Sequence, residues 1–191
     1  MDNTIKAFVL VVAIVFTAAA YLFLSPEETF NSTDIPAKIM VAYTNVEHGI
    51  SFTYPDTYIL NEMEVGNGER WHYNITLIDK EAAANVPQNG EGPISITIDI
   101  FQNNLDKLTI AEWVNNVSYS NFKLILGGAL TSITLADKEA LAYTWDGLYR
   151  GDSIVFEHDG NIVMLSVTYL SPEDDIISDF VNIALSLELT D

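Results

Sequence analysis

The chain has 191 residues, with 8 Lys and Arg against 27 Asp and Glu, a formal net charge of −19 at pH 7 and no cysteine. This length suits one domain of about 150 residues plus an appendage, and a hydrophobic content of 49% excludes a chain that is disordered throughout. The lack of cysteine excludes disulfides, a thiol nucleophile, thiolate metal sites and a lipid-modified cysteine. Because so negative a field repels phosphates, we expect no nucleic-acid partner.

The excess of acidic over basic residues has a general and a specific interpretation. Excess negative charge commonly just keeps a protein soluble. The alternatives are a cation-rich or high-salt environment, or a partner with a basic surface.

The first feature along the chain is the apolar run of residues 5–24, IKAFVLVVAIVFTAAAYLFL, in which Lys6 is the single charged residue. Twenty helical residues span about 30 Å, the thickness of the hydrocarbon core of a bilayer. Lys6 lies at the first turn, from which its side chain can reach the lipid headgroups. The run therefore predicts one transmembrane helix.

The same run contains Ala18-Ala19-Ala20, a small-residue pattern after which a signal peptidase could cleave. The apolar residues continue through Leu24, past the length of about 7–15 residues that is usual for a cleaved signal. This favours an uncleaved signal anchor, with cleavage after Ala20 as the alternative. Lys6 and the α-amino group precede the span, whereas the first basic residue after it is Lys38, which predicts a cytoplasmic N-terminus and an extracytoplasmic C-terminal domain.

The predicted organisation has four parts. Residues 1–4 are a short cytoplasmic tail and residues 5–24 the transmembrane signal anchor. Residues 25–38 are rich in Ser, Thr, Pro and acids without periodicity, which indicates a flexible tether. Residues 39–191 form the folded domain.

The first half of the domain contains segments whose apolar and polar residues alternate, as in strands covered on one face. Residues 50–54 alternate in this way and end at Pro55-Asp56, which predicts a strand and a turn. Residues 94–100 place an isoleucine at every second position. In residues 70–78 one face carries Trp71, Tyr73, Ile75 and Leu77, and the other carries Arg70, His72, Asn74 and Thr76.

The second half is richer in strands. Leu141, Tyr143 and Trp145 share a face before a turn at Asp146-Gly147. Asp159-Gly160, between residues 152–158 and 162–170, is a dipeptide favoured in tight hairpins. Residues 162–170 are apolar at almost every position, which predicts a central strand covered on both faces.

Two helices are expected among these strands. Thr109 is followed three residues later by Glu112, the spacing of a capping box at a helix start. Ser171-Pro172-Glu173-Asp174 predicts the start of the last helix, with Ser171 as the N-cap and Pro172 at the first helical position. Its apolar stripe, expected to pack on the sheet, is Ile176, Ile177, Phe180, Val181, Ala184 and Leu185. The fold class is α+β: an antiparallel β-sheet packed with helices.

The order of these elements resembles the PsbP-like superfamily, which includes PsbP proteins and DcrB-type envelope proteins. Residues 49–58, GISFTYPDTY, are similar to the opening strand and turn of that family. Residues 94–101 with the helix at 108–114 are similar to its middle section. The hairpin around Gly160, followed by Ser171-Pro172 and a helix ending near Leu189, resembles its closing unit.

The resemblance covers residues 39–189 and implies a PsbP-like α/β/α sandwich. It also implies a binding or assembly role without a common active site. Because members of such a fold have unrelated partners, the resemblance does not identify the partner of this chain.

Three clusters of residues could carry chemistry. His72 with Arg70 and Asn74 aligns three polar groups on one strand face, although a solvated face explains them equally well. Glu157-His158-Asp159 could bind a metal or move a proton, but adjacent strand residues point to opposite faces. Glu173-Asp174-Asp175 could coordinate calcium, although acids at a helix start are a sufficient explanation.

The chain has no nucleophile elbow, zinc-protease motif, phosphate-binding loop or dinucleotide-binding motif. We therefore assign no catalytic, cofactor-binding or metal residue and expect no cofactor. The expected function is that of a non-enzymatic, membrane-tethered accessory domain that binds or stabilises a protein partner in the cell envelope. The alternatives are a hydrolase or metal-dependent enzyme with a scattered site, and a sensor of a small ligand or cation.

Overall fold

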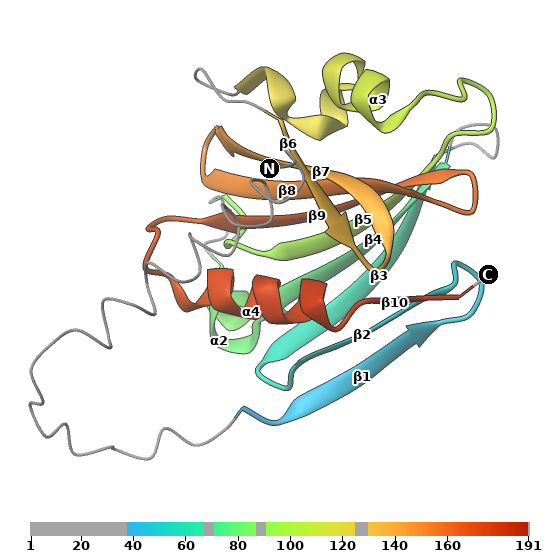
Figure 1. Ribbon diagram of the computed structural model, residues 1–191. Coiled ribbons are helices and arrows are strands. Elements are labelled where there is room, and N and C mark those ends of the chain that lie inside the picture. Colours follow the sequence, from blue (N-terminus) through green and yellow to red (C-terminus); the bar gives the residue numbers. More distant parts are fainter. Residues whose placement is uncertain (1–37, 67–70, 87–90, 125–129, 191) are drawn as a thin grey trace, which may run out of the picture. The chain divides into compact units, whose positions relative to one another are not determined.

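The computed structural model describes residues 38–66, 71–86, 91–124 and 130–190 (Figure 1). The described residues from Ile39 onward belong to one compact unit. The predicted anchor at 5–24 and the tether up to residue 37 lie outside the described residues. Within the described ranges, no helix combines the length and apolar character needed to cross a bilayer.

The domain is built around an antiparallel sheet of seven strands, all visible in Figure 1. In spatial order these are β3 (Tyr58–Gly66), β4 (Trp71–Asp79), β5 (Ile96–Gln102), β9 (Asn161–Tyr169), β8 (Arg150–His158), β7 (Lys138–Asp146) and β6 (Thr131–Leu135). The strand β9 lies between β5 and β8 and is buried along most of its length, which confirms the predicted central strand.

A second, three-stranded sheet lies beside the last helix on one side of the large sheet. It consists of β1 (Met40–Asn45), β2 (Ile50–Pro55) and β10 (Glu188–Leu189), with β2 in the middle. The helix α4 (Asp175–Leu185) connects to this sheet through Ser186, whose hydroxyl accepts a hydrogen bond from Thr53 N at 3.0 Å. The α+β class with antiparallel strands is confirmed, while the division into two sheets was not predicted.

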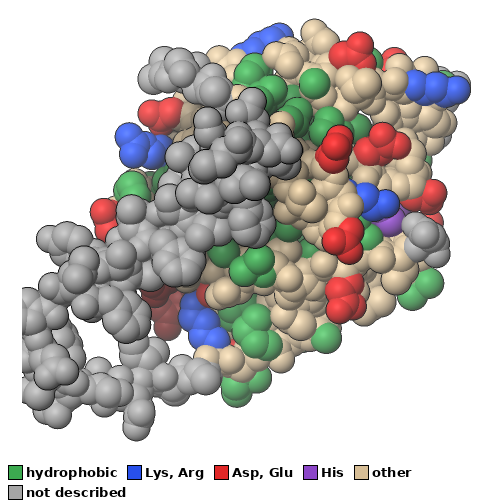
Figure 2. Space-filling view, in the orientation of Figure 1, with side chains coloured by type: hydrophobic (Ala, Val, Ile, Leu, Met, Phe, Trp, Pro, Cys, Tyr) green, Lys and Arg blue, Asp and Glu red, His purple; other side chains and the backbone are tan. Residues whose placement is uncertain are grey.

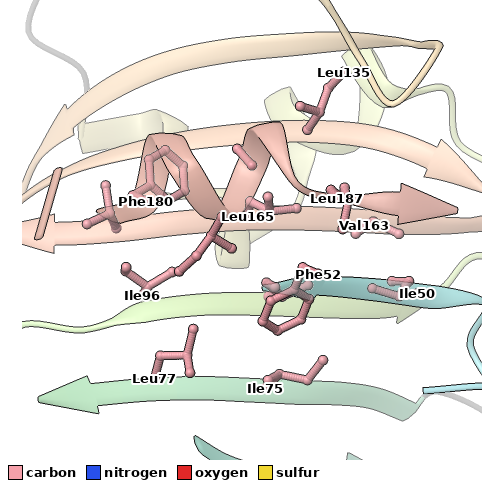
Figure 3. Packing of buried hydrophobic residues seen from close by; sticks show 14 of the residues in the cluster. Ile50, Phe52, Ile75, Leu77, Ile96, Leu135, Val163, Leu165, Phe180 and Leu187 are labelled. Carbon is pink, nitrogen blue, oxygen red and sulfur yellow. The ribbon is translucent and has the colours of Figure 1, made fainter. Parts of the chain in front are cut away.

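The main hydrophobic core lies between these two layers, and Figure 3 shows part of it. The large sheet contributes alternate residues, among them Ile75 of β4 and Ile98 of β5, both 0% exposed. The opposite layer contributes Phe52 of β2 together with Phe180 and Ile183 of α4. Since each fully buried side chain of this size stabilises the fold by roughly 1.5–3 kcal/mol, this layer pairing dominates the stability of the domain.

A smaller core lies on the other face of the large sheet. Here α3 (Ile110–Asn116) places Trp113 and Val114 against Phe101 of β5 and Val155 of β8. Two short 3-10 helices follow, η1 (Ser118–Ser120) and η2 (Phe122–Leu124). A further short helix, α2 (Lys80–Ala84), follows β4. The domain therefore has three layers: α3 with the smaller core, the large sheet, and α4 with the small sheet.

Two of the predicted local motifs are confirmed. Thr109 is the N-cap of α3, and both hydrogen bonds of its capping box with Glu112 are formed. Asp159 and Gly160 form the two-residue turn between β8 and β9, with φ of 49° and 71°. Positive φ at both central residues is the requirement of the hairpin turn that their sequence favours.

The predicted start of the last helix is wrong, whereas its predicted buried face is right in part, since Ile176, Phe180 and Ala184 are buried. The helix begins at Asp175 with Asp174 as N-cap, because the Asp174 carboxylate instead accepts hydrogen bonds from Leu170 N and Ser171 N and closes a turn there. Ser171 and Pro172 thus precede the helix.

The apolar stripe of this helix is rotated from the predicted one. Val181 is 43% and Leu185 77% exposed, whereas Ile183 is fully buried. Asp179 is also buried, because it accepts a hydrogen bond from the Tyr58 hydroxyl at 2.9 Å. A buried acid on the core side could not be recognised from an apolar pattern.

Candidate functional site

The face of the large sheet that carries α3 is covered only in part, and its open part is polar. Strand alternation points His72 and Asn74 of β4, Asp99 of β5 and Ser166 of β9 to this face. The neighbouring residues on the same strands point into the main core. The sequence thus lines one side of the sheet with isoleucine and the other with hydrogen-bonding groups.

A cleft of about 340 Å³ lies over this polar row, between the sheet and η1. Its lining combines a buried carboxylate, aromatic rings and several hydroxyl groups. The lining residues are Thr97, Asp99, Phe101, Ser118, Tyr119, Asn121, Trp145, Met164, Ser166 and Thr168. We refer to it as the Asp99 cleft.

Asp99 is 7% exposed as a residue, and its carboxylate is held by residues of the neighbouring strand. Asn74, its register partner on β4, donates a hydrogen bond from Nδ2 to Oδ1 at 2.7 Å. The Nε2 atom of His72 lies 3.5 Å from the same oxygen. Thr76 in turn donates to Asn74 Oδ1 at 2.6 Å, which fixes the orientation of the amide.

Burial raises the pKa of the Asp99 carboxyl above its ordinary value, although hydrogen bonds from Asn74 and Thr97 and the nearby His72 act in the opposite direction. Desolvation therefore has the larger effect, because it disfavours the charged form of an acid. A perturbed acid inside a cleft is a feature that functional sites share.

Aromatic rings form one wall of the cleft. The His72 ring stacks on Phe101 with 4.8 Å between centroids, and Phe101 also contacts Trp113 at 4.9 Å. Tyr119 lies over this pair, 5.3 Å from His72 and 5.2 Å from Phe101. Tyr119 is 55% exposed, so that its ring is held at the mouth of the cleft without being part of the core.

The other wall is fixed by buried hydrogen bonds. Trp145 Nε1 donates to Ser153 Oγ at 3.0 Å, and Ser153 Oγ lies 2.8 Å from Ser166 Oγ. The hydroxyl of Tyr143 donates to the carbonyl of Ser120 at 2.6 Å and ties η1 to β7. These bonds make the cleft a preformed feature of the fold.

His72 lies beside the Asp99 carboxylate and two aromatic rings. A carboxylate beside a histidine can orient a general base, but such a base also needs a nucleophile within hydrogen-bond reach. The Nε2 atom of His72 approaches Asp99, and its ring contacts are with Phe101 and Tyr119, none of which is an activated nucleophile. Among the described residues, no group of three or more His, Cys, Asp or Glu is placed to hold a metal ion.

The structure brings together part of the first predicted cluster. His72 and Asn74 both contact Asp99, whereas Arg70 lies outside the described residues. Asp99 and Tyr119 were not predicted as site residues. Asp99 could have been found by pairing the two predicted strands in register, but no sequence signal places Tyr119 over the sheet.

The second cluster, Glu157-His158-Asp159, is separated by the strand geometry as expected. His158 points to the opposite face from Glu157 and is 4% exposed, and no described residue forms a hydrogen bond with either of its ring nitrogens. It lies against Gly49, where a Cβ atom would come within 2.9 Å of His158 Nε2 and 2.2 Å of Thr190 O. Gly49 also has φ of +62°, so this close approach requires glycine.

Glu157 and Asp159 line a separate, shallower hollow of about 690 Å³ beside the start of α3. Its lining includes Lys107, so that charges of both signs face it, and its other residues are mainly amides. The third cluster, at Glu173-Asp174-Asp175, does not act as a unit: Asp174 closes the turn before α4, and Glu173 accepts a hydrogen bond from the Ser171 hydroxyl. The Asp99 cleft is therefore the best candidate site.

Comparison with known proteins supports the fold. No protein-family profile and no curated protein sequence matches the chain. The solution structure of cyanobacterial PsbP (CyanoP) from Synechocystis sp. PCC 6803 matches 86% of this chain and 100% of its own length, with a TM-score of 0.52 and 13% sequence identity. This chain has a PsbP-like fold.

Two further solved structures are more distant from this PsbP-like chain. A Pseudomonas aeruginosa protein of unknown function, PA94, is 14% identical over 72% of this chain and 87% of its own, with a TM-score of 0.31. LpqN, involved in cell envelope biogenesis of Mycobacterium tuberculosis, is 10% identical over 82% and 93%, with a TM-score of 0.33. Those scores are too low to support a shared fold.

Proposed function

We propose that this chain is a non-catalytic accessory protein, tethered to a membrane, whose PsbP-like domain lies outside the cytoplasm and binds an envelope protein. The observation that carries the binding role is the Asp99 cleft. It is a preformed hollow on an open sheet face, and it joins a buried carboxylate to an exposed aromatic ring. Recognition sites commonly combine apolar walls with a few fixed polar groups in this way.

The proposed membrane attachment is inferred from residues 5–24, whose length and apolar character suit a bilayer-spanning helix. Lys6 in the first turn of this run and the amino terminus lie at its N-terminal end, and no basic residue follows it until Lys38, which favours an extracytoplasmic domain. A tethered domain meets its partner along a surface. This raises the effective concentration of the pair without any additional contact between them.

The partner is proposed to present a basic surface. The chain carries a net charge of −19, and Figure 2 shows acidic side chains spread over the visible face with few Lys or Arg between them. A negative field of this kind accelerates association with basic proteins and disfavours acidic ones. Association should therefore weaken as salt screens the charges.

Site-resolved photocrosslinking of the full-length protein in its own membranes tests this function. A photoreactive residue in place of Tyr119 should form an adduct of one defined size, and the yield should fall at high salt. The matched control replaces Leu185, which is 77% exposed on α4, and should give no such adduct.

The same membranes also test the attachment of the protein to the membrane and the side on which the domain lies. The protein should stay with the membrane after alkaline extraction, and protease added outside should digest the domain. A protein released by alkali, or a domain protected until the membrane is lysed, would contradict the proposed topology. Adducts from Leu185 and none from Tyr119 would contradict binding at the cleft.

A further inference from the structure

We propose that the Asp99 cleft receives a single cationic side chain of the partner, an arginine by preference, held between the Asp99 carboxylate and the rings of Tyr119, Phe101 and Trp145. This inference deepens the proposed function and depends on it. It assigns the chemical group that the cleft recognises.

The first support is the state of the Asp99 carboxylate. Asp99 is 7% exposed as a residue, and the hydrogen bond that its carboxylate accepts from Asn74 comes from a neutral amide. His72 is a charged partner only when its ring is protonated. The described residues that line the cleft include no Lys or Arg. A buried carboxylate without a full counter-charge gains more from an incoming cation than an exposed one would.

The second support is the aromatic wall. Phe101, Tyr119 and Trp145 line the same hollow as Asp99, and aromatic faces attract cations through the ring quadrupole. Tyr119 reaches the mouth of the cleft, where it can cover a group that has entered. A carboxylate beside several rings is the combination that suits a desolvated cation.

The third support is the rim of hydroxyl and amide groups, formed by Thr97, Ser118, Asn121 and Thr168. A guanidinium group has five N–H donors, which exceeds what one carboxylate can accept. The oxygens of the rim can accept the remaining hydrogen bonds. The planar guanidinium also stacks on rings better than a lysine ammonium, which is the reason for expecting arginine.

The test uses the full-length protein in detergent micelles, with N-acetyl-arginine amide as the probe. The neutral control is N-acetyl-citrulline amide, which has nearly the same shape and no charge. Nuclear magnetic resonance follows the indole N–H of Trp145, which lines the cleft, and the side-chain amide of Asn74, which donates to the Asp99 carboxylate. We expect arginine amide to shift these signals and to bind at least about tenfold more tightly than the citrulline control.

Two variants separate the contributions of the Asp99 carboxylate and the Tyr119 ring to arginine binding. Asp99→Asn keeps the shape of the side chain and its hydrogen bond from Asn74, and it should weaken arginine binding about tenfold or more. Tyr119→Ala removes one exposed ring and should weaken binding by a few-fold. The thermal unfolding midpoint of both variants should stay close to that of the native chain, so that a loss of binding is not a loss of fold.

Several outcomes would overturn the inference. Equal binding of the arginine and citrulline probes would show that charge is not recognised, and unchanged binding by Asp99→Asn would show that the carboxylate is not involved. If arginine amide binds only after Arg70→Gln, a side chain of the chain itself fills the cleft. If the crosslink from Tyr119 persists while arginine amide fails to bind, the proposed function stands and the cationic group is wrong.

Discussion

The two faces of the large sheet use the same strands for different purposes. On the face toward α4 and the small sheet, the side chains of β5 are isoleucines that are 0–2% exposed. On the other face, one residue along, β5 presents Thr97, Asp99 and Phe101 to a cleft. Because successive strand residues point to opposite sides, one strand can stabilise the fold and form a binding surface without compromise.

The polar groups of the two faces differ as well. On the closed face, Asp179 of α4 is 4% exposed and accepts a hydrogen bond from the Tyr58 hydroxyl. On the open face, Asp99 is equally buried but borders a hollow that solvent or a ligand can enter. Substitutions on the closed face should therefore change stability, and those on the open face should change binding.

The largest effect is expected for Phe180→Ala on the closed face. Phe180 is 4% exposed in the main core, and its truncation should lower the free energy of unfolding by about 3–5 kcal/mol. Val181→Ala, at the neighbouring exposed position, should cost less than about 1 kcal/mol. Denaturant midpoints of the two variants measure the difference, and a larger loss for Val181→Ala would mean that α4 buries its other side.

A smaller loss is expected for Tyr58→Phe. This change removes the hydroxyl that donates to the buried Asp179 carboxylate at 2.9 Å while keeping the ring. The expected cost is about 1–3 kcal/mol, because a buried acceptor loses one of its donors. Chemical denaturation at neutral pH measures it. A variant as stable as the native chain would show that this bond contributes nothing to the closed face.

Thr109→Ala tests how much α3 stabilises the open face of the large sheet. Thr109 caps α3, which carries the smaller core and leads into η1. Loss of the cap should lower the free energy of unfolding by about 0.5–2 kcal/mol. Thr109→Ser retains the capping oxygen and should recover most of the loss. If both variants were equally destabilised, the methyl group of Thr109 would matter more than its hydroxyl.

The smallest effect on stability, and one of opposite sign, is expected for Asp99→Asn. Since the pKa of Asp99 is raised in the folded state, its folded form binds the proton more tightly than the unfolded chain does. Its contribution is therefore most favourable below the ordinary value near 3.9 and is lost as pH rises through the folded pKa. At neutral pH the variant should therefore be as stable as the native chain or more stable.

Unfolding measurements between pH 4 and pH 7 check this sign. The advantage of the variant should grow as pH rises across this range. An Asp99→Asn chain that is destabilised at pH 7 and not at pH 4 would mean that the ionised carboxylate stabilises the fold, contrary to its burial.

The parts of the fold that the sequence predicted are those with local physical causes. The capping box at Thr109 and the hairpin at Asp159-Gly160 are decided by a few adjacent residues, and both are present. The central strand at residues 161–169 follows from its almost continuous apolar character. The resemblance of residues 49–58 pointed to the PsbP-like fold, which the similarity to CyanoP supports.

The parts that were missed depend on contacts between distant residues. The start of α4 moved because the Asp174 carboxylate bonds to backbone amides before the helix, and its buried face follows the pairing of Asp179 with Tyr58. Asp99 and His72 come together only through the register of β4 with β5. The position of Tyr119 depends on how η1 is tied to β7, which no local pattern in the sequence specifies.

The separation of roles between the two faces is tested most directly by amide hydrogen exchange of the full-length protein, measured in its own membranes and after purification in detergent. If the partner binds the open face, peptides that cover β4 and η1 should exchange more slowly in the membranes, while those from α4 and β2 stay unchanged. Slower exchange confined to α4 and β2 would contradict the account, because it would place the partner on the face that we assign to stability.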